Sequence, residues 1–149
     1  MMSPTEKERL LIDAFATVTS TLVRDHDFVE LLQTLVEITK DITDATDVGL
    51  LLVDGTGHLE VVTSTRENGD LIETMERGAH SGPCQQSFRT GEIVADSDIA
   101  ASPPEWAEFR DAALALGLRA VVSIPMRYRT SIIGVLVHLS RPDRRVPRE

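Results

Sequence analysis

The single cysteine of the chain, Cys84, lies in the segment Gly78–Ile99 together with one histidine, His80, and the closely spaced carboxylates Asp96 and Asp98. A thiol close to a helix N-terminus can have a lowered pKa and act as a nucleophile. The alternative role is that of a small, buried apolar residue beneath a short helix. We favour the buried role, because no histidine or basic residue adjoins Cys84 in the sequence.

The other residues able to do chemistry lack the spacing that catalysis or metal binding needs. Helical metal-ligand spacing is absent from the histidines, which are His26, His58, His80 and His138. One cysteine excludes an internal disulfide and a cysteine-cluster metal site. Asp96 and Asp98 are close neighbours, which favours capping of the next turn over acid–base work around a substrate. The sequence therefore predicts no catalytic residue, no metal and no cofactor.

Hydrophobic periodicity and turn residues predict the elements that hold this segment. Helices are expected at Thr5–Arg24, from Asp27 onward, and at Asp70–Arg77, Pro83–Thr90 and Trp106–Leu116. Strands are expected at Asp47–Val53, His58–Thr65, Glu92–Ala95, Arg119–Arg127 and Ser131–Ser140. Hairpin turns between successive strands favour antiparallel pairing, and the helices do not alternate regularly with the strands. The expected fold class is therefore α+β.

Length and composition indicate a single globular domain. A chain of 149 residues with 42% hydrophobic residues is long enough for one domain, expected at residues 1–140, with 141–149 as a tail or the start of a linker. The net charge of −9 argues against direct nucleic-acid binding, which needs clustered Lys and Arg. We find no signal peptide and no apolar run of membrane-spanning length, so a cytoplasmic location is expected.

The first expected helix carries an apolar stripe that could join two copies of the chain. Two consecutive amphipathic helices need two apolar partners, and the sheet provides one. We expect the stripe to form a homodimer interface, with candidate residues Leu11, Phe15, Val18 and Leu22. The alternative, in which both helices pack within their own domain, stays open.

Three motifs in the correct order resemble those of the GAF domain, a sensory fold related to PAS. Ser81–Glu92 (SGPC…RTGE) is similar to the family's helix and short strand, and Leu116–Met126 (LGLRAV…IPM) to its strand entry. Ile133–Leu136 (IGVL) is similar to its final strand. The resemblance implies a central antiparallel sheet of roughly five to six strands. It further implies two N-terminal helices on one face, and short helices and loops that roof a pocket on the other.

These motifs are most similar to those of actinobacterial GAF modules that precede ANTAR. ANTAR is a helical RNA-binding domain used in transcription antitermination. No ANTAR sequence is present here, so an output of ANTAR, kinase or phosphatase type would belong to another part or another protein. Other GAF branches fit less well. Free methionine-(R)-sulfoxide reductases use several cysteines, bilin-binding domains commonly place His after the cysteine, and the cyclic-nucleotide signature is absent.

The resemblance places a ligand pocket between the sheet and its roof. Candidate lining residues are Leu52, Val62, His80, Cys84, Phe88, Trp106 and Ile124. We therefore expect a non-enzymatic sensory domain that binds a small ligand of unknown identity, dimerises, or both. The alternatives are a ligand-free dimerisation module and, less favoured, an enzyme of the sulfoxide-reductase type.

Overall fold

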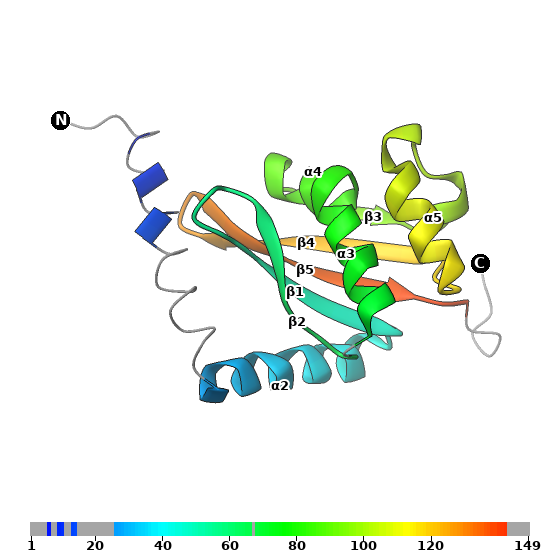
Figure 1. Ribbon diagram of the computed structural model, residues 1–149, viewed down its shortest axis with the longest axis horizontal. Helices are drawn as coiled ribbons and strands as arrows, with labels where there is room; N and C mark the ends of the chain where they lie inside the picture. The colour runs from blue at the N-terminus through cyan, green and yellow to red at the C-terminus, as the bar shows by residue number, and fades with distance from the viewer. Residues whose placement is uncertain (1–5, 7–8, 11–12, 15–25, 67, 143–149) are drawn as a thin grey trace.

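The computed structural model describes residues 6, 9–10, 13–14, 26–66 and 68–142 (Figure 1). The four residues predicted for the dimer interface, Leu11, Phe15, Val18 and Leu22, lie outside the described residues, as does most of the predicted tail.

The described residues form one five-stranded antiparallel sheet in the order β2-β1-β5-β4-β3. Its strands are β1 (Asp47–Val53), β2 (Leu59–Ser64), β3 (Val94–Asp96), β4 (Ala120–Tyr128) and β5 (Ser131–Ser140). β1 is the most buried, because it is paired on both sides and covered on both faces, and its near-continuous apolar sequence matches that position. The α+β class and the antiparallel sheet are confirmed.

Helices cover both faces of the sheet, as Figure 1 shows with α2 on one side and α3, α4 and α5 on the other. The helices are α2 (His26–Thr43), α3 (Gly69–Ser81), α4 (Pro83–Thr90) and α5 (Ala107–Ala115). Two 3-10 turns, Ile99–Ala101 and Pro104–Trp106, precede α5. We call the α3–α4–α5 layer the roof. Among the described residues no helix is both long and apolar enough to cross a membrane.

The two faces of the sheet have separate apolar cores, since successive strand side chains point to opposite faces. On the roof side, Leu51 and Val137 pack with residues of α3, α4 and α5. On the other side, Val48 and Leu50 pack against Val36 of α2.

A β-bulge in β2 decides which of its side chains face the roof. Leu50 pairs with Thr63 and Leu51 pairs with Val61, so Val62 is the extra residue between them. Val61 therefore faces the roof core, whereas the Thr63 hydroxyl donates to the side-chain oxygen of Gln33 on α2. Without this extra residue, the two side chains would share one face.

Several predicted bounds differ from the structure. The helix expected to end at Arg77 continues to Ser81 in α3. The short strand expected at Glu92–Ala95 is β3, at Val94–Asp96. The predicted helix from Trp106 begins as a 3-10 turn, and its α-helical part covers Ala107–Ala115. The predicted short helix at Pro83–Thr90 and the strand at Ser131–Ser140 have the bounds that were expected.

Candidate functional site

Cys84 lies in the second position of α4 and is completely buried in the roof core. Its Sγ is 3.6 Å from the Ser123 Oγ on β4. Burial raises the pKa of the Cys84 thiol to about 12, and the Ser123 hydrogen bond offsets this only in part. At neutral pH the residue is therefore a protonated thiol without access to solvent, which matches the buried role.

Two more predicted pocket residues also belong to the roof core. Trp106 is 6% exposed, and its ring meets that of Phe109 edge-on, with centroids 6.3 Å apart and planes at 87°. Phe88 is partly buried and packs against the same cluster. Cys84, Phe88 and Trp106 are therefore part of the packing between the roof and the sheet.

Leu52 and Ile124 lie on the opposite face of the sheet from Cys84. Ile124 pairs with Leu136, which packs against the α2-side core. Leu52 lies two residues beyond Leu50 on β1 and approaches Gly134 on that same side. The structure thus corrects the expectation of a common pocket, and Val62 occupies the bulge of β2.

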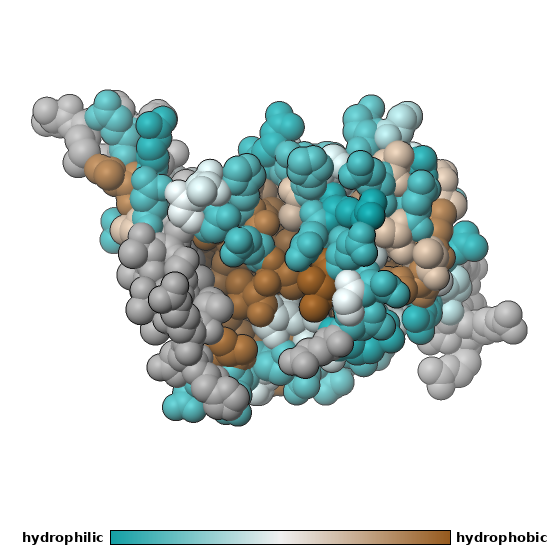
Figure 2. Space-filling view, viewed as in Figure 1, coloured by the Kyte–Doolittle hydropathy of each residue, from teal (hydrophilic) through white to brown (hydrophobic). Residues whose placement is uncertain are grey.

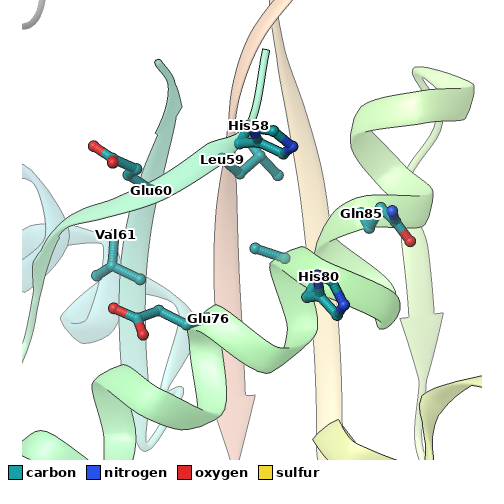
Figure 3. Close-up of a pocket in the computed structure, with 8 residues that line it drawn as sticks. His58, Leu59, Glu60, Val61, Glu76, His80 and Gln85 are labelled. Carbon is teal, nitrogen blue, oxygen red and sulfur yellow. The ribbon is translucent and has the colours of Figure 1, made fainter. Parts of the chain in front are cut away.

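A cleft of about 530 Å³ opens between β2, α3 and the start of α4. Figure 3 shows its lining, and Figure 2 shows apolar side chains gathered in a hollow between polar rims over the same elements. The lining residues are His58, Leu59, Glu60, Val61, Glu76, Ala79, His80 and Gln85. Of the residues predicted from sequence, only His80 lies in this cleft.

The β2 wall of the cleft is positioned by the turn that precedes the strand. The Asp54 carboxylate accepts from the backbone N–H groups of Thr56, at 2.8 Å, and His58, at 3.0 Å. The Thr56 hydroxyl lies 2.6 Å from Asp54 Oδ1 and 2.7 Å from His58 Nδ1. These contacts fix the His58 ring at the mouth of the cleft.

The α3 wall follows from the cap and the periodicity of the helix. The Asn68 side-chain oxygen accepts from the backbone N–H of Asp70 at 2.9 Å and thereby begins α3. Glu76, Ala79 and His80 recur at helical spacing and line the cleft. Figure 3 shows the Glu76 side chain extending toward Val61 of β2. The adjoining face of α3 enters the roof core through Leu71 and Met75, and Ala79 packs against the same core.

Gln85 reaches the cleft because α4 begins immediately after α3. A Cβ at Gly82, between the two helices, would lie 2.8 Å from the Gly78 Cα and 3.1 Å from the Phe109 Cβ. Only glycine fits this close approach. Pro83 then occupies the first position of α4, where its missing N–H costs no helical hydrogen bond.

The described lining of the cleft contains Glu60 and Glu76 and no Lys or Arg. Only the Glu76 carboxylate faces the cleft, because Glu60 pairs with Leu52 and its side chain points to the α2 face of the sheet. The nearest cation on α3 in sequence, Arg77, pairs instead with Glu73 at 2.6 Å and lines a separate groove toward α5. Among the described residues no group of three or more His, Cys, Asp or Glu could hold a metal ion. The arrangement can therefore offer hydrogen-bond acceptors and an apolar floor to an organic molecule.

Several lining residues were not predicted from the sequence. Among them are His58, Glu76 and Gln85, which come from the turn before β2, from α3 and from α4. The periodicity of α3 could have placed Glu76 and His80 on one helical face. No local pattern could have placed that face against β2.

Comparisons with known proteins agree with this fold. A family model for the GAF domain matches residues 25–147. The structure resembles a Staphylococcus aureus protein described as NreA mutated in its nitrate-binding site, with a TM-score of 0.63 and 17% identity over 80% of this chain and 90% of that one. It also resembles a GAF domain/HD domain protein from Geobacter sulfurreducens, with a TM-score of 0.59 and 17% identity over 80% and 76% of the two chains.

A third similar structure is the free methionine-R-sulfoxide reductase of Neisseria meningitidis, solved with its substrate. The TM-score is 0.57, and the identity is 20% over 94% of this chain and 77% of that one. No curated protein matches the chain.

A five-stranded antiparallel sheet with helices on both faces defines an α+β domain. The family match covers most of its length, and the chain belongs to the GAF domain family.

Proposed function

We propose that the chain is a regulatory GAF domain that binds a small organic molecule in the β2–α3–α4 cleft. The observation that carries this proposal is the cleft itself, in which polar groups converge around an apolar floor. A volume of about 530 Å³ suits a metabolite-sized ligand. The predicted space beneath Cys84 and Trp106 is filled by their own side chains, so we place the ligand at this cleft instead.

The roof offers a route from the cleft to the end of the chain. α3, which forms one wall, lines a groove with α5. The carbonyl of Leu116, just after α5, accepts from Arg141 Nε at 3.0 Å, and the Arg141 backbone N–H donates to Thr46 Oγ1 at 2.9 Å. A ligand that favours one arrangement of the roof would thereby shift the position of the chain after β5.

The proposal is tested with a thermal-shift screen of metabolites on the full chain. A true ligand should raise Tm by about 2 °C or more, because it binds only the folded state. Ala79→Leu places a larger side chain on the cleft floor and should abolish the shift. Ala112→Leu, in the separate α3–α5 groove, is the matched control and should preserve it. The absence of any stabilising compound, or shifts unaffected by Ala79→Leu, would overturn the proposal.

A nitrate site like that named for the Staphylococcus aureus protein is not part of the proposal. An anion bound in this cleft would face Glu76 without a compensating Lys or Arg among the lining residues. Thiol catalysis of the sulfoxide-reductase type is disfavoured by the burial of Cys84 and by its raised pKa. We therefore propose a binding function without catalysis. We further propose a cytoplasmic location and an output domain of the ANTAR, kinase or phosphatase type.

A second function, homodimerisation, is favoured by an exposed apolar stripe on α2. Its residues are Leu31, Leu35, Ile38 and Ile42, which are 64%, 46%, 50% and 77% exposed. Their alternating spacing of four and three residues is that of a coiled-coil seam. The sheet-facing side of α2 is separately occupied, with Val36 fully buried. We propose that a second copy of the chain covers this stripe.

Light scattering tests the dimer. Leu35→Glu combined with Ile38→Glu should convert a dimer to a monomer without unfolding the domain, because both side chains face away from its core. Glu37→Arg, an exposed charge reversal on the same helix, should leave the mass unchanged. A native chain that remains monomeric at high micromolar concentration would refute the dimer.

A further inference from the structure

We propose that the β2–α3–α4 cleft selects a small organic cation, an ammonium, amidinium or guanidinium group attached to a compact apolar body. The inference rests on the proposed ligand-binding function and specifies the chemical class of the ligand. It follows from three properties of the lining: its charge, the hydrogen-bonding state of His58 and its apolar floor.

The fixed charge at the cleft is negative. Glu76 reaches it from α3, and Figure 3 shows its carboxylate beside Val61, whereas the Glu60 side chain leaves β2 on the other face of the sheet. Among the described residues Glu76 belongs to no ion pair. An incoming cation would gain an ionic partner at Glu76 without breaking an existing salt bridge, whereas an anion would be repelled.

The neutral form of His58 contributes a hydrogen-bond acceptor rather than a donor. The Thr56 hydroxyl has one proton, and its 2.6 Å contact with the acceptor-only Asp54 carboxylate uses it. The 2.7 Å contact between Thr56 Oγ1 and His58 Nδ1 must then be donated by Nδ1–H. We therefore assign the tautomer whose Nε2 carries the free lone pair.

The Asp54 carboxylate stays ionised and maintains this arrangement. Its partial burial raises its pKa, but hydrogen bonds from Thr56 and His58 outweigh that effect and hold the pKa below the ordinary value. The chain of contacts from Asp54 through Thr56 to His58 thus orients one more acceptor at the cleft, beside those of Glu76 and Gln85.

The floor requires an apolar part in the ligand. Leu59, Val61 and Ala79 are partly buried and pack against the roof core, so their remaining exposed surface lines the cleft. Figure 2 shows this apolar surface between the polar rims. A ligand that places a hydrocarbon group on the floor and a cationic group near Glu76 satisfies both features.

Three nearly isosteric probes distinguish the charge of the ligand: benzamidine, benzamide and benzoate. Titration of each probe into the full chain at low ionic strength, followed by NMR or calorimetry, should rank benzamidine first. We expect benzamidine to bind at least tenfold more tightly than benzamide and benzoate to bind least. Glu76→Gln should weaken benzamidine binding about fivefold to tenfold and leave benzamide binding unchanged. Asp111→Asn, which removes an exposed carboxylate on α5, should change neither affinity.

The outcomes separate this inference from the proposed function. Equal or tighter binding of benzoate, or benzamidine binding that is insensitive to Glu76→Gln, would overturn cation selection. If Ala79→Leu still abolished binding of those probes, the cleft would remain a ligand site. Failure of benzamidine to bind would likewise overturn the inference, and the metabolite screen would then decide the proposed function by itself.

Discussion

The Cys84 Sγ lies 3.6 Å from the Ser123 Oγ, and this contact joins the roof helix α4 to β4 inside the core. The adjacent turn of α4 strengthens the connection, since the Ser87 hydroxyl lies 2.8 Å from the Glu92 carbonyl and 3.2 Å from that of Ser123. The only cysteine of the chain thus helps to hold the roof on the sheet.

Cys84 should therefore be unreactive in the folded protein. Complete burial and a thiol pKa raised to about 12 leave almost no accessible thiolate at mildly alkaline pH. Ellman's reagent should modify the thiol only as fast as the domain opens, and should react at once in denaturing guanidinium chloride. Rapid modification of the native protein would contradict this prediction.

His138→Leu should stabilise the domain. Nε2 of His138 is buried, and none of the described residues offers it a hydrogen-bond partner. The ring stands between its register partners Val48 and Val122. Replacement by an apolar side chain removes the cost of the unpaired nitrogen, and we expect a gain of about 1 kcal/mol in the free energy of unfolding, measured in urea at neutral pH. A loss of stability would refute this account.

The same residue should make stability depend on pH. Burial lowers the pKa of His138, so the unfolded chain takes up the proton at a higher pH than the folded one does. The full stability is present above the unfolded pKa, about 6.5, and declines as the pH falls from there toward the lower folded pKa. The advantage of His138→Leu should therefore grow on acidification. A stability difference between the native chain and His138→Leu that stays constant on acidification would disprove this pH dependence.

Asp47→Ala should cost far more stability than the loss of a surface ion pair. The Asp47 side chain is fully buried and accepts from Arg66 Nε at 2.8 Å and from Nη2 at 2.6 Å. Removal of the carboxylate breaks this bidentate pair at the start of β1, and we expect a loss of about 2–4 kcal/mol. Glu73→Ala, which breaks the exposed pair with Arg77, should change stability by less than about 0.5 kcal/mol. Equal losses of stability in Asp47→Ala and Glu73→Ala, measured by urea unfolding, would contradict this prediction.

Gly134→Ala should be severely destabilising. A Cβ at this position of β5 would lie 2.4 Å from the Leu51 carbonyl oxygen and 2.7 Å from the Met126 Cε. The methionine could move, but the carbonyl belongs to the neighbouring strand, so β1 and β5 would have to separate. We expect a loss of about 2 kcal/mol or more, seen as a lower Tm. Gly55→Ala, with open space around the new methyl group, should be tolerated.

Local patterns in the sequence were sufficient for most elements of the fold. The apolar run of β5 between Ser131 and Ser140 was long enough to give both of its bounds. Pro83 and Gly91 delimited α4, and Gly91 has the left-handed conformation, with φ of 70°, that ends a helix. The burial of Cys84 was also predictable, because no neighbouring residue in the sequence could activate it.

Only the tertiary structure decided which side chains share a site. Side chains alternate between the two faces along β1 and β4, and this alternation puts Leu52 and Ile124 on the α2 side. Both strands are apolar on both faces, so their sequences do not indicate which face each side chain takes. The bulge at Val62 aligned Leu59 and Val61 with the roof, and the glycine at position 82 allowed α4 to begin beside the end of α3. Long-range packing therefore brought His58, Glu76 and Gln85 to one cleft, since no spacing along the chain encodes the approach of β2 to α3.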